Sequence, residues 1–552
     1  MEGVKSYPEE AVKEYQEKGW WIGTTLIDAF NRTCDIYPEK EAVIEVEQGT
    51  RFTFSQIREM AHKVALAFLE LGIKKGDFVL LQIPNWSEAI YTQLGLDLIG
   101  VIPVLCLPRH GRRELEGFCA LTRAVAWIGP AMHRGIDYVS MARTVRENTS
   151  YLQHLVVVRG DTVSDTLSFS RLTERIKPDE SAITYLNKFK PSPNDVLQLS
   201  PTGGTTGFPK LVPKTHNMHL SKAYYWARTL ERGPKDVDLI AMPVNHDAAQ
   251  TSVIAPFALF GSKLVLQAST RVKDILESME KEGVTFYPSV PALVNDLVNE
   301  PDLEKYDLLP ELLVCIGGAY APPELIEAAN EKLKCRLSVP YGSTEGVACD
   351  TIRLNDFDAI MRTVGRPVCP YDEYKIMDEE GHELPQGQEG EIACRGPSFL
   401  SGYYKSEEED KLAFTKDGFF RTGDIGRFDK QGNLTITGRK KDLIKRGGET
   451  IIPSEIEELI TRHPKISQVA VVGMPDPRLG EKACAYIQPV PGGKISFDEI
   501  ISFLKAQGAS LLLLPERVEV VTELPLTDAG KADKQVLKLD IAQKLAAEKV
   551  IS

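Results

Sequence analysis

The sequence predicts an α/β protein: a large N-terminal body followed by a small α+β domain. Three observations support this class. The chain has 552 residues, which is more than one ordinary domain needs. Apolar runs of strand length alternate with stretches of helical apolar spacing over most of the chain. After about Gly432 the strands shorten and the polar content rises.

The N-terminal body is expected to contain βαβ units. Residues 25–34, 55–75 and 86–98 have helical apolar spacing, and residues 42–46, 51–53, 78–83 and 101–107 are typical of strands. Further strands are predicted at 239–242, 263–266, 284–287 and 312–316. Strands that alternate with helices form largely parallel sheets with helices packed against them.

The C-terminal domain is predicted to start after a polar turn at Asp429–Gly432. Strands are expected at 434–437 and 469–472, and a helix at 497–507. The stretch Ser454-Glu-Ile-Glu457 matches a capping box, which predicts a helix from there to His463. The domains are therefore placed at residues 1–429 and 430–552.

Charge and cysteine spacing narrow the function classes. The formal net charge of −13 disfavours nonspecific binding to nucleic acid or to anionic membranes. The longest apolar run, Leu98–Leu107, is too short to span a bilayer, and the N-terminus lacks the apolar region of a signal peptide. The nine cysteines contain no CxxC pair, so neither a disulfide framework nor a zinc ribbon is predicted, and a cytoplasmic location fits best.

The segment Leu199-Ser-Pro-Thr-Gly-Gly-Thr-Thr-Gly-Phe-Pro-Lys210 is the most informative motif. Its glycines allow close approach of the backbone to an anion, its threonine hydroxyls can donate to phosphate oxygens, and Lys210 supplies positive charge. The order differs from the P-loop, because no Ser or Thr follows the lysine. The alternative is a flexible Gly/Thr linker. The phosphate-binding residues predicted here are Thr202, Gly203, Gly204, Thr205, Thr206, Gly207 and Lys210.

This loop resembles the signature loop of adenylate-forming enzymes, which include acyl- and aryl-CoA synthetases, nonribosomal adenylation domains and luciferases. The resemblance covers nearly the whole chain, because five further motifs follow in the family's order. They are Tyr341-Gly-Ser-Thr-Glu345, Gly390-Glu-Ile-Ala-Cys-Arg-Gly396 with Gly402-Tyr-Tyr404, Arg421-Thr-Gly-Asp424, Gly438-Arg439 with Lys445-Arg-Gly-Gly-Glu449, and Pro525-Leu-Thr-Asp-Ala-Gly-Lys531.

The resemblance implies that a carboxylate attacks the α-phosphate of Mg-ATP, giving acyl-AMP and pyrophosphate, and that a thiol then displaces AMP. Positive charge and N–H dipoles would offset the repulsion between the two anions. The family implies that Glu345 binds Mg²⁺ and that Thr344 binds the α-phosphate. Tyr341 would stack on the adenine beside Gly342, and Gly318 and Ala319 would contact the nucleotide. Asp424 would bind the ribose, Arg439 would contact ribose or phosphate, and Lys531 would bridge the carboxylate and the α-phosphate.

Plainer roles stand beside these. Lys531 could be a solvated loop lysine, Asp424 a turn residue and Tyr341 a core aromatic. The basic run Arg439–Arg446 could be a solvated face, or a phosphate of coenzyme A could dock near it. The family also implies a hinge at Asp429, about which a mobile C-terminal domain would rotate between the two half-reactions. The face presented for thiol transfer would then include Lys445, Gly447 and Gly448.

Within the family the chain is most similar to stand-alone 2,3-dihydroxybenzoate–AMP ligases, which carry His-Asn-Tyr near the substrate ring. His246 matches, and it is expected to line the acid pocket and close over the carboxylate, although it could be a core histidine. Asp247 and Ala248 depart from the pattern. Asp247 either faces an amino or hydroxyl group of the substrate or pairs within the protein. The other predicted pocket residues are Ser252, Gly317, Gly318, Ala319 and Val347.

The prediction is thus an acid–thiol ligase that uses ATP, Mg²⁺ and a thiol, either coenzyme A or the phosphopantetheine of a separate carrier protein. The acid is expected to be aryl or a related cyclic acid. The alternatives are a luciferase-like oxidative enzyme and a non-catalytic nucleotide-binding relative. Lys210, Glu345, Asp424 and Lys531 argue against the non-catalytic alternative.

Overall fold

The computed structural model describes residues 1–552 except 161, 163–164, 203–207, 355, 447–448, 508, 528–530 and 552. The chain forms two compact units. The first contains Met1–Thr202, Phe208–Glu373 and Arg395–Phe414, and the second contains Tyr374–Cys394 and the chain from Thr415 onward. The second unit therefore takes in a segment that precedes the predicted boundary at Asp429, and the hinge position remains a prediction.

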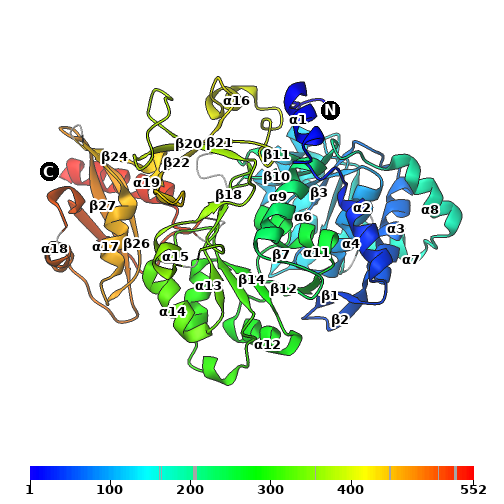
Figure 1. The fold of residues 1–552 in the computed structure, drawn as a ribbon, viewed down its shortest axis with the longest axis horizontal. Helices are drawn as coiled ribbons and strands as arrows, with labels where there is room; N and C mark the ends of the chain where they lie inside the picture. Colours follow the sequence, from blue (N-terminus) through cyan, green and yellow to red (C-terminus); the bar gives the residue numbers. More distant parts are fainter. Residues whose placement is uncertain are drawn as a thin grey trace. The chain divides into compact units, whose positions relative to one another are not determined.

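Two seven-stranded sheets form the framework of the first unit (Figure 1). Each is parallel except for one antiparallel edge pair, β10 with β11 and β1 with β2. The first sheet has the order β11 (Leu211–Thr215), β10 (Val196–Pro201), β4 (Ile102–Leu105), β3 (Phe78–Leu81), β5 (Ala126–Pro130), β8 (His154–Val158) and β9 (Leu167–Ser168). The second has the order β16 (Arg336–Ser338), β15 (Leu313–Ile316), β14 (Phe286–Ser289), β12 (Val237–Ile240), β13 (Lys263–Leu266), β1 (Glu41–Glu45) and β2 (Thr50–Thr53).

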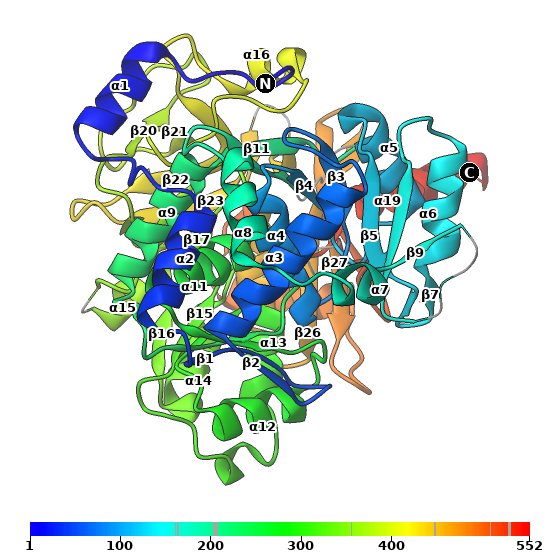
Figure 2. The ribbon, with the colours of Figure 1, turned by 90° about the vertical axis from the view of Figure 1, so that its right-hand side faces the viewer.

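Helices cover these sheets, and α3 and α4 run side by side (Figure 2). A capping box starts α3, because Thr53 Oγ1 accepts the N–H of Gln56 while the Gln56 side chain accepts the N–H of Thr53. The helices of this unit are α1 (Glu9–Glu17), α2 (Leu26–Ile36), α3 (Phe54–Glu70), α4 (Ser87–Leu98), α5 (Arg112–Thr122), α6 (Tyr138–Glu147), α7 (Phe169–Glu174), α8 (Glu180–Leu186), α9 (His216–Thr229), α10 (Asp247–Ala249), the π-helical turn η2 (Gln250–Ile254), α11 (Ala255–Phe260), α12 (Val272–Glu282), α13 (Pro291–Val298), α14 (Pro323–Leu333), α15 (Phe357–Arg362) and α16 (Glu407–Ala413).

The main hydrophobic core of the first unit lies between the two sheets. It combines Val79 and Leu81 of β3 with Leu264 and Leu266 of β13 and with the buried faces of α2, α3, α4 and α11. Burying each such aliphatic side chain stabilises the fold by about 1.5–3 kcal/mol. This shared core fixes the position of the strand ends that carry the functional loops. Two smaller elements complete the unit, a sheet of β17 (Tyr341–Gly342), β18 (Ala348–Asp350) and β19 (Arg366–Pro367) and a hairpin of β6 (Met132–His133) and β7 (Ile136–Asp137).

The second unit holds two antiparallel-rich sheets, with α17 packed on β26 (Figure 1). Its strands are β20 (Glu373–Met377), β21 (Gly390–Arg395), β22 (Phe420–Phe428), β23 (Leu434–Arg439), β24 (Ile444–Arg446), β25 (Glu449–Ile451), β26 (Ile466–Asp476), β27 (Gly480–Pro489) and β28 (Arg517–Val520), and its helices are α17 (Pro453–Thr461), α18 (Phe497–Ala506) and α19 (Lys534–Ile551). Two expectations are wrong here. Strands β26 and β27 have 11 and 10 residues rather than a short span. The N-cap of α17 is Ile452, while the Ser454 hydroxyl bonds the Thr437 carbonyl.

The nine cysteines are thiols, and all of them lie within the described residues. Eight are buried and Cys335 is half-buried. Burial raises the pKa of Cys34 and that of Cys335 to about 12. Among the helices described, none has both the length and the apolar character needed to cross a bilayer.

Candidate functional site

The predicted phosphate loop joins the two strands of the β10–β11 hairpin. The Thr202 N–H donates to the Lys210 carbonyl at 2.8 Å, and the Lys210 N–H donates to Thr202 Oγ1 at 3.1 Å. The ends of the loop are therefore tied together. The other predicted phosphate-binding residues, Gly203, Gly204, Thr205, Thr206 and Gly207, lie outside the described residues.

Lys210 and Glu345 both contact Tyr403. The Lys210 ammonium lies 4.7 Å from the centre of the Tyr403 ring and pairs with Glu409 of α16 at 2.6 Å. The Tyr403 hydroxyl donates to Glu345 Oε1 at 2.8 Å. The structure thus brings together a lysine and a carboxylate that are far apart in the sequence. Tyr403 was not among the predicted site residues, although it lies in the Gly402-Tyr-Tyr404 motif.

A tight hairpin between β17 and β18 positions Glu345. Tyr341 pairs with Cys349 across the hairpin, and the Ser343 N–H donates to the Val347 carbonyl at 3.1 Å. Gly342 follows Tyr341 in β17, and Val347 is fully buried beneath the turn. Tyr341, Ser343, Thr344 and Glu345 are each half-buried, so these side chains are held but not sealed from solvent.

The Glu345 carboxylate is suited to a magnesium ion whose other ligands are phosphate oxygens and water. In the part of the chain that the structure describes, no group of three or more His, Cys, Asp or Glu side chains could hold a metal ion. Mg²⁺ bound to a nucleotide needs no such group, because one or two carboxylates, phosphate oxygens and water complete its shell. Glu345 is held through one oxygen by the Tyr403 hydroxyl and can provide such a carboxylate.

Asp247 forms ion pairs within the protein, as one of the two alternatives of the sequence analysis describes. Its carboxylate lies 3.1 Å from Lys214 Nζ and 3.8 Å from Lys222 Nζ. Burial alone would raise the pKa of Asp247, but the two ammonium groups outweigh it and hold the pKa below its ordinary value. Sequence reasoning missed Lys214 and Lys222. Lys214 is the one charge in the short strand β11, whereas Lys222 lies in helix α9 among several other polar residues, so no clear signal marked it.

The two lysines also hold the Tyr341–Glu345 motif. Lys214 Nζ donates to the Thr344 carbonyl, and Lys222 Nζ donates to the Ser343 carbonyl at 3.0 Å. Ammonium groups need such acceptors when they are buried, since an unpartnered buried donor is costly. The predicted acid pocket and the predicted Mg-ATP motif are therefore linked through Lys214 and Lys222.

His246 and Ser252 occupy the same short helical region as Asp247. His246 is the N-cap of α10, and its Nδ1 accepts the Ala248 N–H at 3.2 Å, so the ring is fixed by its own turn. The Ser252 hydroxyl donates to the Ala248 carbonyl at 2.7 Å. Ser252 is buried, and its hydroxyl hydrogen already has this acceptor in the helix.

The predicted glycine pocket follows β15. The Gly317 N–H donates to the Ser289 carbonyl at 3.0 Å, and a Cβ on Gly317 would lie 2.9 Å from Pro340 Cγ. Gly318 has φ +81°, a conformation that side chains other than glycine rarely adopt. Gly318 is exposed and Ala319 half-buried, so backbone N–H and C=O groups are accessible at this loop.

Asp424, Arg439 and Lys531 lie near one another in the second unit. Arg439 pairs with Asp424 across strands β22 and β23, and its Nε donates to Asp424 Oδ1 at 2.7 Å. The Thr527 hydroxyl accepts the backbone N–H of Lys531 at 3.3 Å. Desolvation by the surrounding chain and the positive charge of Arg439 lower the pKa of Lys531 to about 8, against the attraction of Asp424.

The predicted hinge and thiol-side residues also belong to the second unit. The Asp429 Oδ1 accepts the N–H groups of Gln431 and Asn433, and the Asp429 carbonyl accepts the Gln386 amide at 2.6 Å. These bonds form a compact turn between β22 and β23. Lys445 is a residue of β24, and Gly447 and Gly448 lie outside the described residues.

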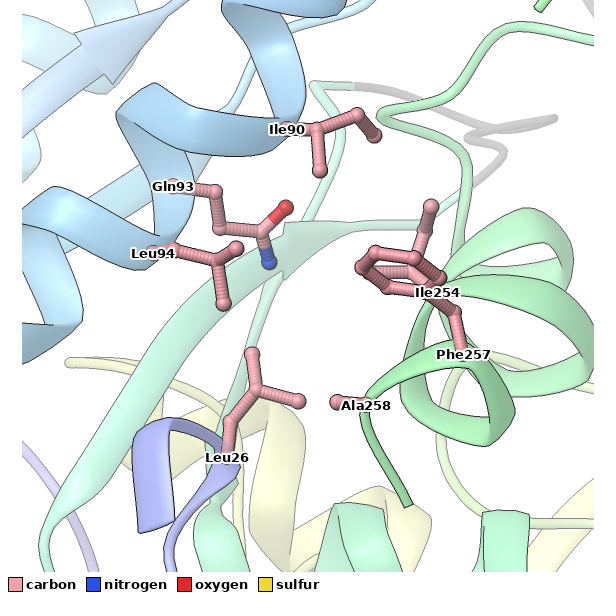
Figure 3. A pocket seen from close by; sticks show the side chains of 7 residues that line it. All are labelled: Leu26, Ile90, Gln93, Leu94, Ile254, Phe257 and Ala258. Atoms are coloured by element: carbon pink, nitrogen blue, oxygen red, sulfur yellow. The ribbon is translucent and has the colours of Figure 1, made fainter. Parts of the chain in front are cut away.

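A small gap in the helical layer of the first unit is not a candidate site (Figure 3). It lies among Leu26, Gln93, Ile254 and Phe257 and has no room for a water molecule. The Gln93 amide at its edge bonds Gln198 and Gln250. The gap is a packing defect of the core.

Comparisons with known proteins agree with this arrangement. The model of the AMP-binding enzyme family matches residues 30–404, and that of the AMP-binding enzyme C-terminal domain matches residues 455–531. Salicylyl-CoA synthase / salicylate adenylyltransferase of a Streptomyces species is 33% identical over 540 residues, 97% of each chain. The 2,3-dihydroxybenzoate-AMP ligase of Bacillus subtilis is 33% identical over 553 residues, 99% of each chain.

Among solved structures, the apo structure of Mycobacterium smegmatis MbtA is 31% identical with a TM-score of 0.73, and the match covers 97% of this chain and 98% of that one. The first match includes the phosphate loop and the Tyr341–Glu345 motif, and the second ends at Lys531. Asp424 and Arg439 lie between the two matched ranges. Sequence relatives, structure and motifs lead to the same conclusion: the chain belongs to the AMP-binding enzyme family.

Proposed function

We propose that this enzyme is an ATP-dependent acid–thiol ligase of the AMP-forming type. It activates a carboxylic acid as acyl-AMP, releases pyrophosphate, and transfers the acyl group to a thiol. The observation that carries this function is the meeting of Lys210 and Glu345 on Tyr403, next to a loop whose ends are tied by Thr202. This contact supports the proposal, because phosphate binding needs a cation and Mg²⁺ binding needs a carboxylate.

In adenylation, the chain's own residues bind and orient the two anions. Lys210 exchanges Glu409 for phosphate oxygens, and the Thr344 side chain donates to the α-phosphate beside it. Tyr341 contacts the adenine, with Gly342, Gly318 and Ala319 along the nucleotide. Glu345 would hold the magnesium ion, which would neutralise charge on the phosphates. His246, fixed by its own helical turn, contacts the substrate carboxylate.

The second unit supplies the remaining groups. Asp424 accepts the ribose hydroxyls, and Arg439 contacts ribose or phosphate from the adjacent strand. Lys531 bridges the substrate carboxylate and the α-phosphate. Desolvation and the positive charge of Arg439 lower its pKa, and a bound anion would oppose both effects.

For thiol transfer, the C-terminal domain rotates, and a different set of its residues closes the site. The hinge is Asp429, between an N-terminal body of residues 1–429 and a C-terminal domain of residues 430–552. The second arrangement presents Lys445, Gly447 and Gly448 to the thiol. The acceptor is coenzyme A or the phosphopantetheine of a separate carrier protein, and a cytoplasmic location provides both.

The acid is aryl or a related cyclic acid. Relatives of similar length are named for salicylate and 2,3-dihydroxybenzoate. In this chain the Asp247 carboxylate is paired with Lys214 and Lys222. The pocket wall next to the acid therefore contains lysines and not an isolated carboxylate. Ser252, Gly317 and Val347 form other parts of the wall.

Pyrophosphate exchange tests the function. ATP, Mg²⁺ and a panel of aryl, alicyclic and amino acids are incubated with labelled pyrophosphate, and label entering ATP is measured. At least one cyclic acid is expected to support exchange, and thioester is expected to form with coenzyme A or a carrier protein. Absence of exchange with every acid would refute the ligase, and oxygen consumption would indicate an oxidative enzyme instead.

A further inference from the structure

Two lysines are buried beside the predicted acid pocket. The Lys214 side chain is 0% exposed and the Lys222 side chain 3% exposed. Lysine is almost never buried without a charged partner. Their only ion-pair partner among the described residues is Asp247, so two ammonium groups share one carboxylate.

The neighbouring titratable groups do not supply a second partner. His219 is buried in the same cluster, and desolvation together with the charge of Lys214 lowers its pKa to about 3, so its ring is neutral at pH 7. Glu345 and Asp372 attract Lys222 from further away, and neither forms an ion pair or a hydrogen bond with it among the described residues. Burial raises the pKa of Asp372 to about 7, which reduces its negative charge.

Lys222 also has unused hydrogen-bonding capacity. An ammonium group has three N–H donors. Lys222 Nζ reaches the Ser343 carbonyl at 3.0 Å, whereas Asp247 Oδ2 at 3.8 Å is beyond hydrogen-bond distance. The remaining donors have no protein acceptor within the described ranges. Buried donors of this kind call for a ligand or water to accept them.

Two further polar atoms of the cluster lack hydrogen-bond partners in the part of the chain that the structure describes. Nδ1 of His219 and Oγ of Ser343 are buried and have no hydrogen-bond partner within the described residues. His219 is 1% exposed, so its nitrogen has no open access to bulk water. The cluster therefore contains excess positive charge and unpaired polar atoms next to His246, the residue expected at the substrate carboxylate.

We infer that Lys222, with His219 and Ser343, forms a subsite for a second carboxylate on the substrate, so that the enzyme activates one carboxylate of a cyclic dicarboxylic acid. This inference rests on the proposed ligase function and names its substrate class. The second carboxylate stays ionised and accepts the unused donors of Lys222, which balances the charge of the cluster. The other carboxylate attacks the α-phosphate of ATP.

Matched pairs of acids test the inference by pyrophosphate exchange with the full-length enzyme. The pairs are benzoate with phthalate, isophthalate and terephthalate, and cyclohexanecarboxylate with its 1,2-, 1,3- and 1,4-dicarboxylates. At least one dicarboxylate is expected to exceed its monocarboxylate partner in kcat/KM by about 100-fold or more, as expected for a site whose buried polar groups stay unpaired with the smaller acid. Monocarboxylates that match or exceed every dicarboxylate would overturn the inference and leave the ligase function intact. Absence of exchange with any acid would overturn both.

Variants separate this role from a purely structural one. In Lys222→Met the ratio of kcat/KM for dicarboxylate over monocarboxylate is expected to fall at least tenfold, and Lys222→Arg is expected to restore much of it. Lys190→Met, which removes a half-exposed lysine paired with Asp28, is the matched control and should leave the ratio unchanged. A lysine that only holds the Ser343 carbonyl would lower both kcat/KM values together, and an unchanged ratio in Lys222→Met would contradict the inference. The wild-type panel decides the question alone should Lys222→Met fail to fold.

Discussion

Replacing Asp247 with asparagine tests whether the buried lysines depend on its charge. The carboxylate lies 3.1 Å from Lys214 Nζ and 3.8 Å from Lys222 Nζ. At an effective dielectric constant of about 20, each attraction amounts to about 4–5 kcal/mol before the cost of burying the carboxylate is subtracted. Removing one partner of a buried ion pair typically costs about 3–5 kcal/mol, because the remaining charge stays buried. We therefore expect Asp247→Asn to lower the free energy of unfolding of the first unit by about 3–5 kcal/mol.

Urea unfolding followed by tryptophan fluorescence measures this loss in the correct unit. All five tryptophans precede residue 227 and lie in the first unit, so the second unit adds no tryptophan signal. Asp35→Asn is the control, because Asp35 is 70% exposed in its pair with Arg58 and should cost about 1 kcal/mol or less.

The double variant Asp247→Asn with Lys222→Met removes one of the two buried ammonium groups that lose their carboxylate partner. It is expected to be more stable than Asp247→Asn alone, since one fewer ammonium is left without compensation. A loss below about 1 kcal/mol for Asp247→Asn, or a double variant less stable than the single one, would refute the reasoning.

Three further predictions concern the chemistry and the charge of the site. Lys531→Ala should slow pyrophosphate exchange by about 100-fold or more while transfer from preformed acyl-AMP to the thiol changes little, and equal losses would contradict its role in adenylation. Asp429→Pro should slow thioester formation more than adenylate formation in single-turnover assays, because proline removes the N–H that bonds Asn433 and fixes the hinge torsion; equal slowing would argue against the hinge. Burial lowers the pKa of Lys222 from 10.5 to about 8, so between these values the unfolded chain binds more protons and stability should rise with pH. Subtracting the free energy of unfolding of Lys222→Met isolates this rise, and a difference that stays flat or falls from pH 8 to pH 10 would count against it.

Local patterns predicted the elements whose own sequence carries a clear apolar signature. The strand predicted at 263–266 is β13, and the helix predicted at 86–98 is α4, because dense apolar runs and helical spacing directly reflect burial. The strand predicted at 469–472 is part of the longer β26, and its partner β27 was not predicted. One face of an antiparallel strand can stay polar, so its ends no longer form a continuous apolar run.

Long-range contacts account for what the sequence could not predict. Ser454 matched a capping pattern, but its hydroxyl donates to the Thr437 carbonyl of β23 and does not cap α17. Asp247 left two alternatives open because its partners come from β11 and α9. Family motifs predicted Glu345 and Lys210, but the contact of both with Tyr403 arises only in the folded chain.

The burial of the cysteines has a chemical consequence for a ligase of this kind. Acyl-AMP is a mixed anhydride, and any thiolate of the protein that reaches it becomes acylated and lost. A thiol with a pKa near 12, as in Cys34 and Cys335, is ionised at pH 7 in roughly one molecule in 10⁵. Burying eight of the nine thiols and suppressing their ionisation leaves the incoming co-substrate as the nucleophile that competes for the acyl group, so the enzyme protects itself from its own intermediate.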